Sequence, residues 1–234
     1  MKIVFISPCF NAAKNIHKLV GSTKCQSDDR WSHVLIDDMS EDATVEVIDR
    51  VIVNDNRYEL VKNDEKKYAL KNIVECARKY QNEDDVIIAV IDGDDQLCNN
   101  DTAKILLEAY DDGFEVVWTA HRWDMDNRNI SKKMPENVNP YYWPWCTSHL
   151  RTFKASILRD VSDENFKDMD GNWFQRGYDQ ALMLPILSLT DKRKYIEDVC
   201  YLYNIDSVSV NDRDWAEMKQ ISTINMVRAR GFLS

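Results

Sequence analysis

Three carboxylates follow a strongly apolar segment near the middle of the chain. Residues 86–91 are all apolar, and Asp92-Gly93-Asp94-Asp95 follows directly. An apolar run bounded by acidic residues is typical of a buried strand. Carboxylates this close raise one another's pKa unless a cation lies among them. A hard divalent cation is the usual solution, and such an ion often holds a phosphorylated substrate. The alternative is a solvated acidic turn, because Asp and Gly are common turn residues.

Two earlier segments also place polar residues after a predicted strand. Ser-Pro-Cys-Phe-Asn occupies residues 7–11, at the end of the strand expected over 3–7. Asp-Asp-Met-Ser-Glu-Asp occupies residues 37–42, after the strand expected over 33–36. Ligands of doubly wound sheets bind outside the carboxyl ends of the strands. Acidic groups at two strand ends on one edge therefore favour a binding site over simple loop residues.

The elements that would position these residues alternate along the first half of the chain. Apolar spacing predicts helices between successive strands, and repeated strand–helix–strand units imply a largely parallel sheet with helices on both faces. The expected strands are 3–7, 33–36, 58–61, 86–91 and 115–119, and the expected helices are 12–25, 43–53, 68–80 and 102–110.

The second half of the chain loses this alternation. Residues 121–148 are polar and aromatic, and we expect a long functional loop there. Order should return over 150–158, followed by a helix over 176–189, a strand over 195–205 and a helix over 214–230. The sequence contains no internal repeat or linker, so we treat residues 1–234 as one α/β domain.

Composition argues against several partners. The formal net charge is −10, and no basic cluster offsets it, so nucleic acid and anionic membranes are not expected as main partners. The six cysteines are scattered without a C-x-x-C pair, which favours reduced thiols and a cytoplasmic protein. The first apolar run is too short for a signal peptide, and no run approaches the ~20 apolar residues of a transmembrane segment.

An ordered set of motifs resembles family 2 glycosyltransferases of the GT-A fold. The segments are VFISPCFNAAKNI, VLIDDMSEDAT, YALKN, VIDGDDQL, HLRTFKASIL, GYDQALMLPIL and YLYNIDSVS, and they span roughly residues 1–210. The resemblance implies a Rossmann-like, mostly parallel central sheet flanked by helices. It also implies a nucleotide-sugar-binding half over 1–119 and an acceptor and catalytic half over 120–234.

The resemblance assigns a nucleotide-sugar pocket to the first half. A carboxylate such as Asp37 or Asp38 can accept a hydrogen bond from a uracil N–H or from ribose hydroxyls. Lys71 could offset diphosphate charge, although a lone helix Lys is equally expected on a solvated surface. The residues implied to bind the donor are Pro8, Phe10, Asn11, Asp37, Asp38, Lys71, Asn72, Asp92 and Gly93.

The segment Asp92-Gly93-Asp94-Asp95, called the acidic quartet below, matches the family's D-x-D motif. By resemblance, Asp94 is the first candidate for direct contact with a Mn²⁺ or Mg²⁺ cofactor. Asp92 would reach the ribose or the metal, and Asp95 would bind through water or orient the site. An EF-hand is a poor alternative, because the run lacks D-x-D-x-D-G and the later Glu.

Asp179 falls where the family carries its catalytic base, although Tyr178 replaces the usual acidic neighbour. The chemistry requires one carboxylate near the acceptor hydroxyl to take its proton. The alternative role is that of an acidic residue favouring a helix N-terminus. Asp168 and Asp170 are the alternate bases.

Four residues of the second half are implied acceptor contacts: Trp143, Trp145, His149 and Arg151. The tryptophans lie in an aromatic segment that could form a platform for an acceptor sugar. A buried aromatic cluster that closes the loop is an equally good interpretation. His149 and Arg151 could equally be satisfied polar residues beneath the loop.

One departure from the family pattern concerns the diphosphate. Many relatives continue with Arg-x-His after Tyr203, whereas this chain has Asn204-Ile205-Asp206. Charge compensation must then come from elsewhere, or Asp206 joins the metal shell.

The resemblance predicts metal-assisted, inverting transfer of a hexosyl group from a nucleotide-sugar, most readily a UDP-sugar, to a hydroxyl of a glycan or glycoconjugate. A nucleotidyltransferase acting on a sugar phosphate is one alternative, although residues 7–11 lack the expected glycine-rich loop. A non-catalytic phosphoacceptor or nucleotide-binding module is another, although its acidic pair should follow the first strand and the chain is far too long for it.

Overall fold

The computed structural model describes residues 1–204 and 213–234, with side chains of the last helix described from residue 217 onward. The described strands form one eight-stranded sheet in the order β3-β2-β1-β4-β7-β6-β8-β5. Their bounds are β1 Lys2–Cys9, β2 Trp31–Asp37, β3 Tyr58–Lys62, β4 Val86–Val90, β5 Gln96–Leu97, β6 Val116–Trp123, β7 Arg151–Lys154 and β8 Arg193–Tyr203.

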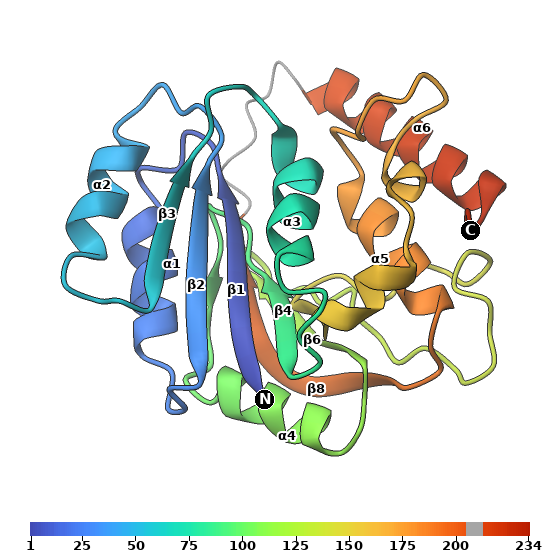
Figure 1. The fold of residues 1–234 in the computed structure, drawn as a ribbon, viewed down its shortest axis with the longest axis horizontal. Coiled ribbons are helices and arrows are strands. Elements are labelled where there is room, and N and C mark those ends of the chain that lie inside the picture. Colours follow the sequence, from blue (N-terminus) through green and yellow to red (C-terminus); the bar gives the residue numbers. More distant parts are fainter. Residues whose placement is uncertain (205–212) are drawn as a thin grey trace.

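Helices cover both faces of this sheet (Figure 1). The helices α1, α2 and α4 pack on one face, whereas α3 and α5 pack on the other. Their bounds are α1 Ile16–Lys24, α2 Thr44–Val51, α3 Tyr68–Arg78, α4 Thr102–Asp111, α5 Tyr178–Ser188 and α6 Arg213–Arg230, with two short 3₁₀ helices at Ala155–Asp160 and Asp163–Phe166. None of the helices in the described part of the chain is long and apolar enough to cross a membrane.

Strand β4 shows why an uninterrupted apolar run forms the centre of the sheet. Its side chains alternate between the two cores, with Ile88 and Val90 on the α3 and α5 face and Ile87 and Ala89 on the opposite face. Both faces are covered by helices, so every position must be apolar. The same run delivers the residues that follow it to the edge where the parallel strands β1, β2 and β4 end.

The second half of the sheet differs from a simple parallel array. Strand β7 runs antiparallel between β4 and β6, and its register sets Arg151 opposite Val90 on one side and Trp118 on the other. Arg151 therefore lies beside the end of β4, only two positions before the acidic quartet. The β7 insertion is what brings the second half of the chain to that quartet.

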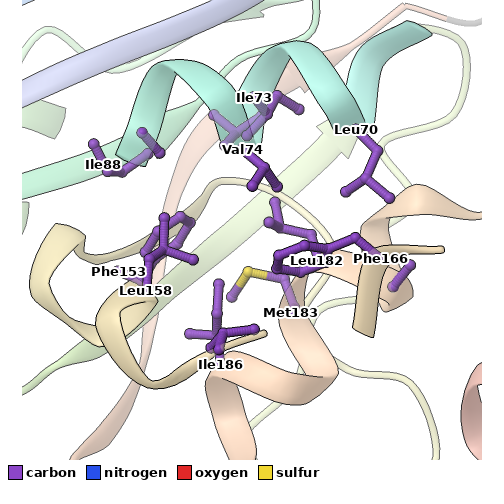
Figure 2. Packing of buried hydrophobic residues seen from close by; sticks show 14 of the residues in the cluster. Leu70, Ile73, Val74, Ile88, Phe153, Leu158, Phe166, Leu182, Met183 and Ile186 are labelled. Atoms are coloured by element: carbon purple, nitrogen blue, oxygen red, sulfur yellow. The ribbon is translucent and has the colours of Figure 1, made fainter. Parts of the chain in front are cut away.

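One apolar core fixes helix α5 against the sheet. Figure 2 shows side chains from α3, α5, β4 and β7 pointing toward one another, with Phe166 of the second 3₁₀ helix closing one side. Helix α5 is buried around most of its circumference and contacts both α3 and α6. The residues labelled in Figure 2 are Leu70, Ile73, Val74, Ile88, Phe153, Leu158, Phe166, Leu182, Met183 and Ile186.

Most expected elements are confirmed within a few residues, including the predicted mostly parallel α/β sheet. Helix α1 begins at Ile16 instead of residue 12, because turns occupy the intervening positions. The long loop expected over 121–148 is confirmed, but it begins at residue 124 and runs to residue 150. Residues 121–123 of the expected loop belong to β6 instead. The short strand β5 was not predicted, since its two residues carry no periodic pattern.

Replacing Leu182 should test the packing of α5. Leu182 is fully buried, so Leu182→Ala should leave a cavity and lower the free energy of unfolding by about 2–5 kcal/mol in chemical denaturation. Leu189 follows the same helix and is 38% exposed, so Leu189→Ala should change stability by only about 0.5 kcal/mol. Equal effects of the two substitutions would contradict the described packing.

Candidate active site

The acidic quartet packs directly against the end of β1. A Cβ atom at Gly93 would lie 2.7 Å from the Pro8 carbonyl oxygen and 3.0 Å from the Cys9 Cα. Real Cβ atoms do not approach backbone this closely, so the position requires glycine. This close approach holds Asp92 and Asp94 at the edge of the sheet, beside the ends of the parallel strands.

Asp92 is the meeting point of three elements. The Arg151 Nη2 atom donates to both carboxylate oxygens, at 3.3 and 3.2 Å. The Tyr178 hydroxyl, at the start of α5, donates to Asp92 Oδ1. Arg151 is only 1% exposed, and a buried guanidinium of this kind stays charged and needs an acidic partner. The ion pair thus ties β4 to β7, and the tyrosine ties both to α5.

Asp95 is buried and held by β8. Its Oδ2 accepts a hydrogen bond from the Tyr201 hydroxyl at 2.6 Å, and its Oδ1 accepts one from the Asn204 backbone N–H at 2.7 Å. The backbone N–H of Asp92 donates to the same Tyr201 oxygen at 3.1 Å. Burial raises the pKa of Asp95, and the charges of Asp94 and Asp92 raise it further. A cation at this point would relieve that repulsion.

Three residues with possible metal-ligand atoms come together here. One ligand atom each from Asp92, Asp95 and His149 lie within 4.8 Å of one another. Two carboxylates and an imidazole form a donor set that suits a divalent transition-metal ion, so the residues fit the expected cofactor. Asp94, predicted as the first metal ligand, is outside this group, but its charge acts on Asp95. Its role as a ligand stays a prediction.

The His149 ring is held by aromatic stacking. It stacks on Tyr201, with ring centroids 4.5 Å apart, and on Tyr203 at 5.3 Å. Its Nδ1 atom is buried and has no hydrogen-bond partner among the described residues. Burial, together with the charge of Arg151, lowers the pKa of His149 well below its usual range, so the imidazole is neutral. His149 thus lies beside Asp92 and Asp95, called the acidic cluster below.

Asp37 and Asp38, the predicted nucleoside contacts, differ sharply. Asp37 Oδ2 accepts from the Ser40 N–H at 3.3 Å, whereas its buried Oδ1 has no partner within the described chain. The carboxylate of Asp38 accepts from the Lys67 and Tyr68 N–H groups, both at 2.9 Å. Burial opposes ionisation of Asp38, but these hydrogen bonds lower its pKa. Asp37 therefore retains binding capacity, and Asp38 positions the start of α3.

The remaining donor-side residues mostly shape the pocket. Asn11 joins the first two strand-end loops, because its N–H donates to Ser40 Oγ at 3.0 Å and its Oδ1 accepts from the Glu41 N–H at 2.8 Å. Phe10 is 49% exposed and lies beneath the Lys66 ammonium. Sequence reasoning missed Lys66, since nothing in its local pattern separates it from neighbouring lysines.

Lys71 and Asn72 lie side by side on α3 but have different surroundings. The Lys71 ammonium is near Glu65 at 3.5 Å and Glu75 at 3.8 Å, which matches the surface alternative. Asn72 is 3% exposed, and its Oδ1 accepts a hydrogen bond from the Asn63 side chain at 2.8 Å.

Asp179 lies in the first turn of α5, directly after Tyr178. Burial raises the pKa of its carboxyl, Arg151 opposes this, and Asp92 adds to it. A raised pKa suits a general base. The alternates lie in a turn, where Asp168 Oδ1 accepts the N–H groups of Asp170 at 3.0 Å and Asn172 at 2.9 Å. Asp168 is thus occupied by its own turn.

The predicted acceptor contacts do not form one group. Trp143 and Trp145 help to line a cavity of about 390 Å³. His149 and Arg151 lie instead at the acidic cluster. Asp206, named above as a possible metal ligand, lies outside the described residues. The other residues lining the cavity are Asn129, Ile130, Lys132, Lys133, Pro144 and Cys146.

Comparison with known families assigns the chain. A sequence profile of glycosyl transferase family 2 matches residues 4–173. The chain belongs to this family. The matched range includes the ends of β1, β2 and β4 and the whole of β7, and it stops before α5. A search of curated protein sequences found no significant match.

Solved structures share the GT-A glycosyltransferase fold of this family 2 member. The crystal structure of S. aureus TarS has a TM-score of 0.71 and 18% identity, covering 100% of this chain but 41% of TarS. TarS 1–349 in complex with UDP-GlcNAc has a TM-score of 0.70 and 18% identity, covering 100% of this chain and 68% of that one. Mannosyltransferase PcManGT from Pyrobaculum calidifontis, in complex with GDP-Man and Mn²⁺, has a TM-score of 0.63 and 17% identity, covering 98% of this chain and 63% of PcManGT.

A methyl group at Gly93 should disturb the site. Gly93→Ala should lower the free energy of unfolding by about 1–3 kcal/mol, because the added Cβ collides with backbone of β1. Gly21, inside α1, has no neighbour in the described part of the chain within 4 Å of an added Cβ, so Gly21→Ala should be neutral or slightly stabilising. Thermal or chemical denaturation of both variants checks this. A neutral Gly93→Ala would contradict the close approach.

Proposed function

We propose that this family 2 member transfers a hexosyl group from a nucleotide-sugar to a hydroxyl of a glycan or glycoconjugate. The observation that supports this most is the meeting of Asp92, Asp95 and His149 at the strand ends, with their ligand atoms within 4.8 Å. A set of this kind suits a metal that binds a diphosphate. Residues 1–119 would supply the donor side, and residues 120–234 the acceptor side and the base.

The proposed donor is a UDP-sugar. The TarS structures in complex with UDP and UDP-GlcNAc support a uridine nucleotide, although PcManGT is in complex with GDP-Man. Asp37 Oδ1 is buried and has no partner among the residues that the structure describes, so it could accept a hydrogen bond from a uracil N–H or a ribose hydroxyl. Phe10 and Asn11 would border the base, and Lys66 would supply a positive charge beside it.

The proposed cofactor is Mn²⁺ or Mg²⁺, which the carboxylates of Asp92, Asp94 and Asp95 would hold. When bound, such an ion neutralises negative charge on the departing nucleoside diphosphate. Arg151 and Tyr178 hold the Asp92 carboxylate in one orientation, through contacts of 3.2–3.3 Å from the guanidinium and the tyrosine hydrogen bond. The Asp92 carboxylate is therefore held in place before a substrate arrives.

The proposed reaction is a single displacement. The Asp179 carboxylate takes the proton of the acceptor hydroxyl, and the hydroxyl oxygen attacks the anomeric carbon of the sugar. The bond from that carbon to the diphosphate oxygen breaks at the same time, so the nucleoside diphosphate leaves with the electron pair and the configuration inverts. Trp143 and Trp145 would offer stacking surfaces to an acceptor glycan.

Nucleotide binding should depend on the quartet. UDP at about 100 times its dissociation constant, with Mn²⁺ present, should stabilise the protein by about 2.7 kcal/mol in a thermal-shift panel of nucleoside diphosphates. Asp94→Asn should remove the part of UDP binding that depends on Mn²⁺, and calorimetry can measure this loss of affinity. Asp112→Asn, an exposed carboxylate after α4, is the matched control and should behave as wild type. No stabilisation by any nucleotide would contradict the proposed function.

Asp179→Asn should separate chemistry from binding. Loss of a general base should reduce kcat by about 10²–10⁴-fold while leaving the UDP dissociation constant nearly unchanged. UDP release from UDP-sugars, with candidate glycan acceptors, measures the rate. Asp160→Asn, an exposed carboxylate at the end of the first 3₁₀ helix, is the control and should retain activity. A wild-type rate in Asp179→Asn would exclude Asp179 as the base.

The pH profile gives a second test of Asp179. Only the ionised carboxylate accepts a proton, so kcat/KM should fall as the pH drops through its pKa. Burial raises that pKa, so the acid limb should lie above the value of about 3.9 for an ordinary Asp. A rate that stays flat down to pH 4 would contradict this role.

A further inference from the structure

The chain lacks the basic pair that many relatives carry after the last strand of the sheet. Asn204 occupies the first of these positions and uses its backbone N–H to bind Asp95 at 2.7 Å. The pattern at residues 204–206 therefore supplies no imidazole to the metal. A different histidine lies at the acidic cluster, on another element of the fold.

We propose that His149, directly before β7, is a nitrogen ligand of the divalent cation. This inference rests on the proposed function, in that it takes the acidic quartet as the cation site. A ring nitrogen of His149 lies within 4.8 Å of carboxylate oxygens of both Asp92 and Asp95. One cation placed among them could therefore contact all three after small adjustments of the side chains.

The surroundings of His149 leave it free for this role. The side chain is 8% exposed, and its buried Nδ1 lacks a hydrogen-bond partner among the described residues. Buried polar atoms are almost always satisfied, so an imidazole that keeps an unpartnered nitrogen calls for a ligand. One of the two ring nitrogens of this imidazole lies in the group with the Asp92 and Asp95 oxygens. A histidine that only packed in the core would be expected to hydrogen-bond, as His33 does with Ser7 at 2.9 Å.

The ring is also held in place before any metal binds. It stacks on Tyr201 with an interplanar angle of 15°. The hydroxyl of that same tyrosine binds Asp95 at 2.6 Å and accepts the Asp92 N–H at 3.1 Å. Tyr201 thus fixes the imidazole relative to both carboxylates. Ligands that are fixed in advance lose little freedom on binding.

A nitrogen ligand has a consequence for the choice of metal. Mg²⁺ takes oxygen ligands almost exclusively, whereas imidazole suits transition metals. A site of two or three carboxylates with His149 should therefore bind Mn²⁺ more tightly than Mg²⁺. An all-oxygen site would discriminate less between the two ions.

Pulsed electron paramagnetic resonance of the wild-type protein with Mn²⁺ and UDP tests the proposal directly. We expect coupling from a directly bound ¹⁴N, replaced by a ¹⁵N pattern when the protein carries ¹⁵N-labelled histidine. His149→Phe keeps a ring to stack on Tyr201 but has no lone pair, so the coupling should vanish. Its Mn²⁺ affinity should fall at least about tenfold, with a smaller loss for Mg²⁺.

His121→Phe is the matched control. His121 is buried, and its ring centroid is 5.5 Å from that of His149, but it is not in the ligand group. His121→Phe should therefore keep the nitrogen coupling to Mn²⁺.

Two results would overturn the proposal and leave the proposed function standing. One is Mn²⁺-dependent UDP binding without a histidine coupling in the wild-type protein, and the other is a coupling that persists in His149→Phe. Absence of Mn²⁺-dependent UDP binding would overturn both. The wild-type spectrum decides even if His149→Phe fails to fold.

Discussion

The site depends on the ion pair between Arg151 and Asp92. A guanidinium that is 1% exposed cannot be left without a counter-charge, and removing one partner of such a pair typically costs about 3–5 kcal/mol. Arg151 is delivered by β7, which runs antiparallel between β4 and β6, and Asp92 is delivered by the end of β4. The contact joins the end of β4 to β7, and the Tyr178 hydroxyl extends it to α5.

This arrangement links the proposed donor site to the proposed base. Tyr178 binds Asp92, and the next residue along α5 is Asp179. The apolar core beneath α5 fixes the helix against α3, and this packing sets the position of Asp179. The neighbouring Tyr178 is held by its hydrogen bond to Asp92. On the other side, Tyr201 binds Asp95 and stacks on His149. Tyrosines, which carry no charge of their own, thus organise the charged groups of the site.

The sequence predicts the first half of the fold and the position of the acidic quartet, because apolar runs and acidic strand ends are local patterns. It does not predict that Asp38 is used by the start of α3, or that Lys66 rather than Lys71 lies over Phe10. Both contacts depend on the path of the loop between β3 and α3, which brings Lys66 to Phe10 and Lys67 to Asp38. The position of His149 depends on the pairing of β7 between distant strands, which no local pattern encodes.

In the proposed function, one edge of the sheet holds a nucleoside diphosphate and a divalent cation together. Crystals grown with UDP and Mn²⁺ and measured at the manganese absorption edge would locate both. We expect an anomalous peak among the carboxylates that follow β4, with the diphosphate on the metal and the uracil beside Asp37. A peak elsewhere, or UDP bound away from these carboxylates, would contradict it.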